Sequence, residues 1–416
     1  MKFGLSTARA TLIRIALTAL FLAVFLQPAH AFYFHQDENS SLEMRGMLQG
    51  SALALRNPDA PLLYNDRHIT GIAASGRLMI DAGVTDLFSF EMHSVLGYAP
   101  IKLQTGGSNL ALLRDVERSG LLDWSFDDKQ GHLLIDRINL QFTSSRVSLK
   151  IGRQPLNFAA TFYFTPNDFF APFAAQTFFR AYKPGVDALR ADIQLPDLSQ
   201  ISLISVLGYS VDASNDNGWS NRPDTSRNSY LGRASTVMGD FEFALLGGTV
   251  KKDRVLGIDF QGELFDWLGV RGEGHIVWPD SPLLRNTTEF ALGVEHRWEN
   301  SFTIRVEQFY HGAGALSATA YNPAALTGGG YLARHYTAVG ASYEFTPLLT
   351  GDATAIHNWV DHSSLLALYS NYSLSDESEL AISATIPMGR KPVGTAVRSE
   401  FGLLPYSLSV EARIYF

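Results

Sequence analysis

Charged side chains between residues 146 and 307 alternate with apolar ones in a way that could line a water-filled passage. One group is basic and lies in or beside two predicted strands: Arg146, Lys150, Arg153, Arg180, Lys183 and Arg190. A second group is acidic and comes from later strands: Glu242, Asp259, Glu263, Glu273, Glu289, Glu295 and Glu307. If the two groups face each other across a lumen, they create a transverse field that orients polar solutes. The alternative is that each charge pairs with a neighbour on an adjacent strand and only hydrates the wall.

A long loop rich in phenylalanine, residues 155–184, lies between the two basic segments. It contains Phe162-Tyr-Phe-Thr-Pro-Asn-Asp-Phe-Phe-Ala-Pro-Phe173, in which Pro166, Asn167 and Asp168 suit the start of a short helix. So many aromatic side chains need burial, and the interior of a barrel can provide it. We therefore expect this loop, with Asp168, to fold inward as the constriction of a channel. The alternative is that it is buried against the rim or in a subunit interface.

The sequence offers little support for an enzyme. Histidines are scattered singly, and none stands at metal-ligand spacing with a carboxylate on a helix. There is no Gly-x-Ser-x-Gly, phosphate loop, dinucleotide fingerprint or Cys-x-x-Cys-His. We expect no catalytic residue, metal or cofactor; His93, His275 and His296 are expected in the lumen or at the membrane interface. An outer-membrane hydrolase is the weakest alternative.

Segments of alternating polarity must hold the charged residues and the loop in place. From residue 42 onward, stretches of about ten residues show the period-2 pattern of strands, at a length that suits a tilted strand crossing a bilayer. We predict about 18 strands, with 16 as the nearest alternative. The predicted strands are 42–56, 70–81, 86–98, 132–143, 146–154, 185–195, 200–211, 229–238, 241–250, 254–264, 267–278, 287–298, 301–311, 331–345, 348–359, 363–374, 379–388 and 405–416.

The lengths of the connections follow a simple rule. Every second connection is short, and the others include nearly all the long ones, at 57–69, 99–131, 155–184, 212–228, 312–330 and 389–404. Outer-membrane barrels have short periplasmic turns and longer extracellular loops. A soluble sandwich has no reason to sort its loops in this way. The pattern predicts an all-β protein, a transmembrane antiparallel up-and-down β-barrel with both ends of the barrel in the periplasm.

The two faces of the predicted strands differ as lipid and water would require. In 254–264, Leu256, Ile258 and Phe260 alternate with Asp259 and Gln261. The segments 287–298 and 301–311 alternate in the same way. A charge on the hydrocarbon side would cost about 2–4 kcal/mol for Arg or Lys at the midplane, whereas the lumen side can keep carboxylates.

The N-terminal residues are typical of a secretory signal. Lys2, Arg9 and Arg14 precede or begin an apolar run, Ile15 to Leu26, and Ala29-His30-Ala31 fits a cleavage site. We predict that residues 1–31 are cleaved, that 32–41 form a short periplasmic lead-in and that 42–416 form the barrel. The alternative, an uncleaved anchor, is disfavoured because the apolar run is shorter than the roughly 20 residues a membrane helix needs.

Composition limits the remaining classes of function. The chain carries a net charge of −8 and no basic run stands out, so we expect no nucleic-acid binding. It contains no cysteine, so an exported form must be stable without disulfides. A closed barrel meets that requirement, because every backbone polar group pairs between strands.

The C-terminal strand, Ser407 to Phe416, alternates strictly and stops on an aromatic residue. It resembles the terminal strand of Gram-negative outer-membrane β-barrels, which ends in Phe and is read by the barrel insertion machinery. The position of 155–184 resembles the third extracellular loop of general porins, which folds into the lumen. These resemblances imply the outer membrane of a Gram-negative bacterium, with outer-membrane lipid around the barrel.

Two shorter motifs are more specific. Arg146-Val-Ser-Leu-Lys-Ile-Gly-Arg-Gln154 with the Pro-Asn-Asp turn after it, and Tyr182-Lys-Pro-Gly-Val-Asp-Ala-Leu-Arg190, resemble the alginate-export and phosphate-selective porin-like channels. The resemblance covers about 145–195 and the general barrel pattern, and no ligand-binding residue is carried over from it.

The sequence therefore predicts an outer-membrane porin for passive diffusion of small hydrophilic solutes or ions. The alternative is a barrel that sheathes a periplasmic or extracellular cytochrome, as in porin–cytochrome conduits. A monomer and a homotrimer are both compatible with the sequence. Any interface between copies is expected on 331–345 and 348–359, where small residues are outward by parity: Ala333, Ala341, Gly351, Ala353 and Ala355.

Overall fold

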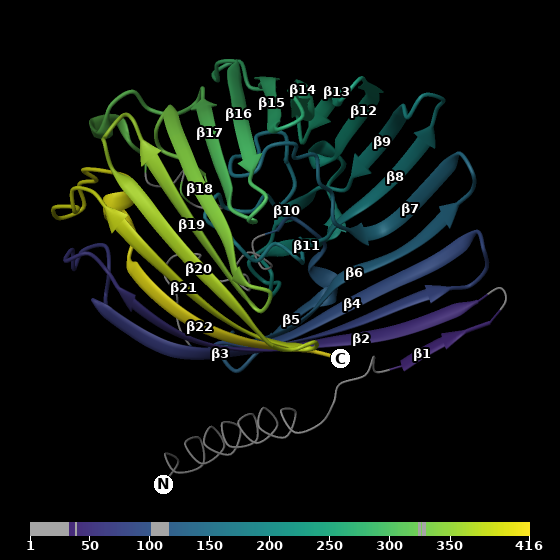
Figure 1. Cartoon of the computed structure of the whole chain (residues 1–416), viewed down its shortest axis with the longest axis horizontal. Coiled ribbons are helices and arrows are strands. Elements are labelled where there is room, and N and C mark those ends of the chain that lie inside the picture. The colour runs from purple at the N-terminus through teal and green to yellow at the C-terminus, as the bar shows by residue number, and fades with distance from the viewer. Residues whose placement is uncertain (1–32, 38–39, 101–115, 323–325, 327–329) are drawn as a thin grey trace, which may run out of the picture.

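The barrel wall is one closed antiparallel sheet. A computed structural model describes residues 33–37, 40–100, 116–322, 326 and 330–416; the expected signal peptide, 1–31, lies outside these residues. The sheet contains 20 strands, of which 18 form the closed ring, and the short β1 and β5 each pair with a single neighbour. The first and last strands of the ring, β2 and β22, pair with each other (Figure 1). The predicted all-β barrel of about 18 strands is confirmed.

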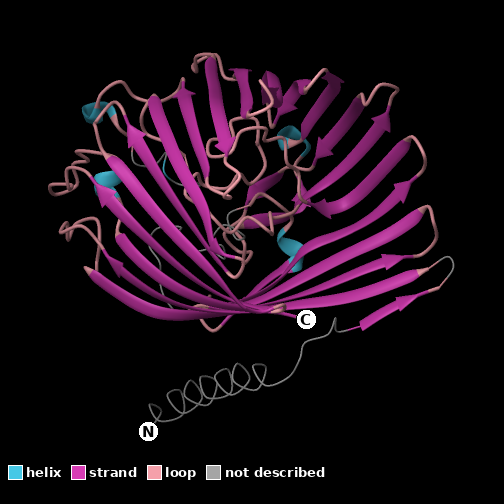
Figure 2. Cartoon of the chain, in the orientation of Figure 1, coloured by secondary structure: helices cyan, strands magenta, loops and turns pink. Residues whose placement is uncertain are grey.

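The ring strands follow chain order, and almost all regular structure is strand (Figure 2). They are β2 Ser41–Arg56, β3 His68–Gly83, β4 Phe88–Tyr98, β6 Gly131–Thr143, β7 Val147–Gln154, β8 Val186–Gln194, β9 Gln200–Val206, β12 Ser229–Met238, β13 Phe241–Val250, β14 Asp253–Leu264, β15 Leu268–Trp278, β16 Thr287–Arg297, β17 Thr303–His311, β18 His335–Thr346, β19 Leu349–Asn358, β20 Ser364–Ser375, β21 Ser378–Met388 and β22 Tyr406–Tyr415.

Four further strands lie outside the ring order. They are β1 Tyr33–Gln36, β5 Asp123–Phe126, β10 Tyr209–Val211 and β11 Trp219–Pro223, and short 3-10 turns occur at Gly120–Leu122, Thr225–Arg227, Ala318–Ala320 and Phe401–Leu403. The lead-in thus contributes a strand, β1, that pairs with the start of β2. No helix in the described part of the chain is long and apolar enough to cross a membrane.

All the long connections lie at one end of the barrel, as the sequence predicts, and every connection at the other end is short. The turns at one end span 84–87, 144–146, 195–199, 239–240, 265–267, 298–302, 347–348 and 376–377. The other end carries 57–67, 99–130, 155–185, 207–228, 251–252, 279–286, 312–334, 359–363 and 389–405. This sorting is the one found in outer-membrane barrels, so we refer to the second end as extracellular.

The outward face is apolar and the inward face carries the polar groups. On β14, Leu256 and Ile258 are 45% and 57% exposed. Asp259, which directly follows Ile258 and points to the opposite face, is only 3% exposed. The same alternation holds on β16 and β17, where Phe290, Leu292 and Val306 are exposed. A strand flanked by hydrocarbon on one side and the lumen on the other needs this distribution.

Three predicted details differ from the structure. The strand predicted at 331–345 begins only at His335, and Ala333 is buried at the inner surface rather than outward. The strand predicted at 200–211 leaves the ring at Val206, and Tyr209–Val211 pairs with β11. The other small residues proposed for an interface between copies lie in the two strands as predicted. Ala341 pairs with Ala353, and Val339 pairs with Ala355. The ring of Phe345 lies against Gly351.

The C-terminal residue helps to close the ring. The backbone groups of Phe416 and Gly46 exchange two hydrogen bonds of 2.6 and 3.0 Å. The ring of Phe416 lies directly against Gly46, where a Cβ would come within 2.1 Å of it. The ring of Phe416 can take this position only because residue 46 is a glycine and has no Cβ.

Candidate pore constriction

The loop after β7, residues 155–185, crosses the barrel interior. Leu156, Phe164 and Asn167 are completely buried, although they lie in a connection between two strands. The ring of Phe164 stacks on Phe309 of β17, with centroids 4.8 Å apart and planes 12° from parallel. The predicted inward fold of this loop is therefore what the structure shows. The short helix predicted near Asn167 does not form.

Glu273 of β15 anchors the first part of the loop. Its buried carboxylate accepts hydrogen bonds from the backbone N–H groups of Ala160, Thr161 (3.0 Å) and Asn167 (2.9 Å). The side chain of Asn167 donates in turn to the carbonyl of Ile258 on β14 at 3.0 Å. A carboxylate that receives three N–H donors is stabilised despite its burial, and it fixes the loop backbone in one place.

Glu307 of β17 anchors the adjacent residues in the same way. It accepts from the backbone N–H groups of Phe162 (2.8 Å), Tyr163 (3.1 Å) and Phe164 (2.6 Å). Two carboxylates of the barrel wall thus satisfy six backbone donors of a segment with no secondary structure of its own. Buried backbone N–H groups need such partners, because leaving one unpaired costs about 1–3 kcal/mol.

Gly340 of β18 makes room for the loop. A Cβ at this position would lie 1.6 Å from the hydroxyl oxygen of Tyr163. The loop therefore packs directly on the backbone of the wall at this point. A larger residue at position 340 would displace Tyr163 and the amides next to it that bind Glu307.

The loop is also bonded within itself. Lys183 forms a buried ion pair with Asp168, and Arg180 donates to the carbonyl oxygens of Thr177 (2.8 Å), Phe162 and Ala175 (3.3 Å). Of the residues expected at the constriction, Asp168, Arg180 and Lys183 therefore lie in the loop and hold its shape.

The far end of the loop reaches the opposite wall. Phe178 stacks on Tyr369 of β20, with centroids 5.2 Å apart. The Arg413 guanidinium of β22 lies 4.0 Å from the centre of the Phe179 ring, and that of Arg77 on β3 lies 4.3 Å from the Tyr182 ring. These cation–π and stacking contacts join the loop to β3, β20 and β22. The loop is attached at both sides of the lumen and narrows it.

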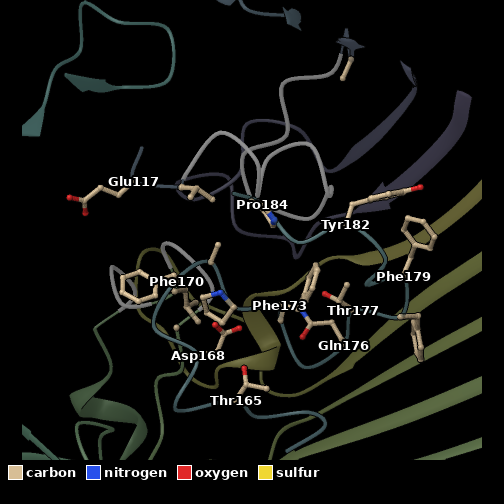
Figure 3. Close-up of a pocket in the computed structure, with 18 of the residues that line it drawn as sticks. Glu117, Thr165, Asp168, Phe170, Phe173, Gln176, Thr177, Phe179, Tyr182 and Pro184 are labelled. Carbon is tan, nitrogen blue, oxygen red and sulfur yellow. The ribbon is translucent and has the colours of Figure 1, made fainter. Parts of the chain in front are cut away.

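A cavity of about 2090 Å³ remains beside the loop. Figure 3 shows Phe173, Gln176, Thr177, Phe179 and Tyr182 of the loop around it. Its other sides come from inward residues of strands around the ring, among them β2, β3, β16, β17, β20, β21 and β22, and from extracellular loops. This volume is large for a small-molecule site, and it suits a passage for hydrated solutes.

Arg153, expected in the pore, belongs instead to a buried charge cluster at the base of the loop. It donates to Asp187 (2.8 Å) and to the carbonyl oxygens of Ile135 (2.8 Å) and Ser119 (2.9 Å). Arg118, Asp123, Asp136 and Arg77 continue the cluster. β7 pairs with the second half of β6, from Ile138 to Thr143, whereas β5 pairs with the first four residues of β6. The ion pairs lie where the pairing changes from one strand to the other. Arg153 therefore holds the wall together at the point where the loop turns inward.

The remaining predicted residues are paired locally or lie at the strand ends. Lys150 is 3.7 Å from Glu91, Arg190 is 2.9 Å from Asp192, Asp259 is 2.8 Å from Arg233, and Glu295 pairs with Arg305. Arg146 is exposed in the turn before β7, and Glu263 is exposed near the end of β14. Among the described residues, these charged side chains pair with neighbours on the same or adjacent strands, as in the alternative interpretation of the sequence. They do not form a basic wall that faces an acidic one.

Three groups of residues have contacts that the sequence does not predict. Arg77, Tyr369 and Arg413 meet the loop aromatics, and only their inward parity could have pointed to them. Glu273 and Glu307 were placed in the lumen, but not as anchors. Asp81, Glu91 and His93 have ligand-type atoms within 4.8 Å of one another. Arg45 and Arg137 already pair with the two carboxylates of that group, at 2.7 and 3.1 Å.

Buried and half-buried acids stabilise the extracellular loops. Glu400 accepts from the Asn358 side chain at 2.8 Å and from the Tyr336 hydroxyl, and burial raises its pKa to about 7. Although burial also favours the neutral form of Glu117, its partners Arg227 and Lys251 hold the pKa of that carboxyl below its usual value. Both acids line the cavity.

Solved structures share this fold. No family model matches the chain, and no curated protein matches it in sequence. Acinetobacter baumannii OccAB3 superposes with a TM-score of 0.58 at 11% identity, over 90% of this chain and 99% of that one. Pseudomonas aeruginosa OccK8 (OprE) gives 0.58 at 10% identity, over 90% and 98%. At these identities the similarity concerns the fold, a barrel of the kind found in the outer membrane.

Proposed function

We propose that the chain is an outer-membrane porin that lets small hydrophilic solutes diffuse passively through a lumen narrowed by the loop 155–185. A ring of 18 strands is wide enough to leave an aqueous channel once side chains fill its inner surface. The observation that carries the proposal is the fixed inward loop beside a cavity of about 2090 Å³. The motifs at Ile151–Gln154 and Tyr182–Arg190 further support a relation to the alginate-export and phosphate-selective porin-like group.

The alternative of a cytochrome sheath fits the interior less well. A partner threaded through the barrel would have to displace a loop bound by six backbone hydrogen bonds on one wall and by three ring contacts on the other. The contacts at both walls favour an obstructed but open passage for small solutes over a filled one.

Planar-bilayer recording tests the proposal. Purified protein should insert in discrete steps and conduct in potassium chloride, and the reversal potential in a salt gradient should give its ion selectivity. Because the inward charges are largely paired with neighbours, we expect only weak selectivity between cations and anions. Silent bilayers with folded protein, together with co-purification of a haem protein, would instead support the sheath.

A further inference from the structure

Beside the loop, one stretch of the lumen wall, formed by 49–55, 73–75, 383–385 and 405–409, carries hydroxyl groups and no charged residue, whereas charged side chains such as Glu117, Glu289 and Glu400 line other parts of the cavity. Six inward side chains of β2, β3, β21 and β22 line the cavity and make no hydrogen bond among the described residues: Ser51, Ser75, Ser383, Thr385, Ser407 and Ser409. All six are half-buried, and the residues that alternate with them on β22, Leu408 and Val410, are exposed on the lipid side. Each of these hydroxyls can both donate and accept a hydrogen bond to a solute.

Four of these hydroxyls form a compact patch. Ser383 is directly opposite Ser409, and Thr385 is directly opposite Ser407, across the β21–β22 pair. Opposed side chains in such a pair lie about 5 Å apart, and residues two apart on one strand lie about 7 Å apart. This spacing has the scale of a single sugar ring with its substituents.

Charge is absent from the patch, and the charged side chains beside it are held in ion pairs. The segments 49–55, 73–75, 383–385 and 405–409 contain no charged residue. At the nearest charges toward the constriction, Arg413 pairs with Glu411 at 2.6 Å and with Glu379 at 3.2 Å, and Arg77 pairs with Asp136 at 2.8 Å. An ion passing here gains no unpaired counter-charge, so the wall favours neutral solutes over ions of the same size.

Aromatic rings adjoin the patch at the constriction. Tyr369 lies directly opposite Ser383 on the β20–β21 pair, and its ring stacks on Phe178 of the loop. Phe173, Phe179 and Tyr182 also line the cavity. The face of an aromatic ring carries partial negative charge and attracts polarised C–H groups. A solute that has C–H groups on one face and hydroxyls at its edge can contact the rings and the patch together.

We infer that the channel selects neutral polyhydroxylated solutes, that is, sugars and short oligosaccharides. The inference rests on the proposed porin function and names the class of solute for the same lumen. Sugars combine the two surfaces present here, because their hydroxyls match the Ser and Thr side chains and their C–H faces match the aromatic rings. The hydroxyl patch itself carries no fixed charge that could bind a sugar acid or an amino sugar.

Current blockade by sugars in planar bilayers tests this assignment on the full protein. Maltotriose added to one side should reduce the ion current reversibly at millimolar concentrations, whereas gluconate and glucosamine at the same concentrations should not. The triple variant S383A/S407A/S409A should keep the potassium chloride conductance, because alanine does not narrow the lumen. Its half-blocking concentration should rise by about tenfold, as expected for the loss of several modest hydrogen bonds.

Ser235→Ala is the matched control. Ser235 on β12 shares the inward parity of Arg233 but does not line the cavity, so its loss should leave the blockade unchanged. A conducting channel that maltotriose does not block, or that gluconate blocks equally, would overturn the inference while the porin function stands. An unchanged half-blocking concentration in the triple variant would also overturn it. If no current is seen, calorimetric titration of the micellar protein with maltotriose decides: heat that is lost in the triple variant supports the inference, and no heat refutes it.

Discussion

Two regions of the lumen wall have the same inward parity but use their polar groups in different ways. On β15 and β17, Glu273 and Glu307 are buried beneath the loop and accept six backbone hydrogen bonds from it. On β21 and β22, Ser383, Thr385 and Ser409 face the cavity and have no partner among the described residues. The first region fixes the loop, whereas the hydroxyls of the second region face the cavity, where we propose that they bind the solute. Inward parity alone therefore does not show which groups a solute can reach.

The largest expected effect comes from removing both anchors. In the double variant Glu273→Gln/Glu307→Gln, the NH2 group of each glutamine would face backbone N–H donors that now meet a carboxylate oxygen. Hydrogen bonds to a charged group, worth about 1.5–3 kcal/mol each, would be lost. The loop should leave the wall, and the single-channel conductance should rise severalfold with increased noise.

The control for this variant is Glu263→Gln, which changes an exposed acid near the end of β14 that does not touch the loop. It should conduct as the unmodified protein does. A double variant that inserts normally and has unchanged conductance would show that the loop does not depend on these two carboxylates, and the contrast between the two regions would lose its basis.

A smaller effect is expected from pH at the extracellular end. Because the buried Glu400 has its pKa raised to about 7, folding favours its neutral form, and this stabilisation is complete below the unfolded pKa of about 4.3. It is lost progressively as the pH rises from there through about 7, and the full difference is about 4 kcal/mol at about 1.4 kcal/mol per pKa unit. Proteolysis of the loops 312–334 and 389–405 should therefore accelerate as the pH is raised from about 4 to 7 and should level off at higher pH.

Glu400→Gln provides the comparison for that pH series. Glutamine stays neutral and can still accept from Tyr336 and Asn358, so the rate of cleavage should no longer change near pH 7. Asp361, Tyr336 and Tyr321 are the other titratable groups of this network. If the pH dependence persists in Glu400→Gln, one of these groups is responsible.

The sequence predicts the barrel well because lipid and water act on every strand in the same way. Leu256 and Ile258 must face hydrocarbon and Asp259 must not, and this rule needs no knowledge of neighbouring strands. The sorting of loop lengths is equally local. The start of β18 at His335 was missed because the preceding residues, such as Ala333, are apolar for a different reason: they pack against the inward loop.

The constriction was predicted only in outline. The need to bury the phenylalanines of 155–184 indicated an inward loop, but nothing in the sequence distinguishes Glu273 and Glu307 from Glu289 or Glu295. Their roles depend on backbone N–H groups more than a hundred residues away. Arg153 was misplaced for the same reason, because its partners Asp187 and Ser119 meet it only in the folded chain.

The most direct test of the account is whether the loop borders the conducting path. The chain contains no cysteine, so Gln176→Cys, at a half-buried loop position that lines the cavity, provides a single thiol for modification during recording. A bulky or charged thiol reagent should reduce the current through this variant and leave Leu283→Cys unaffected, because Leu283 is 93% exposed outside the cavity. An unchanged current after complete labelling of Gln176→Cys would contradict a constriction formed by residues 155–185.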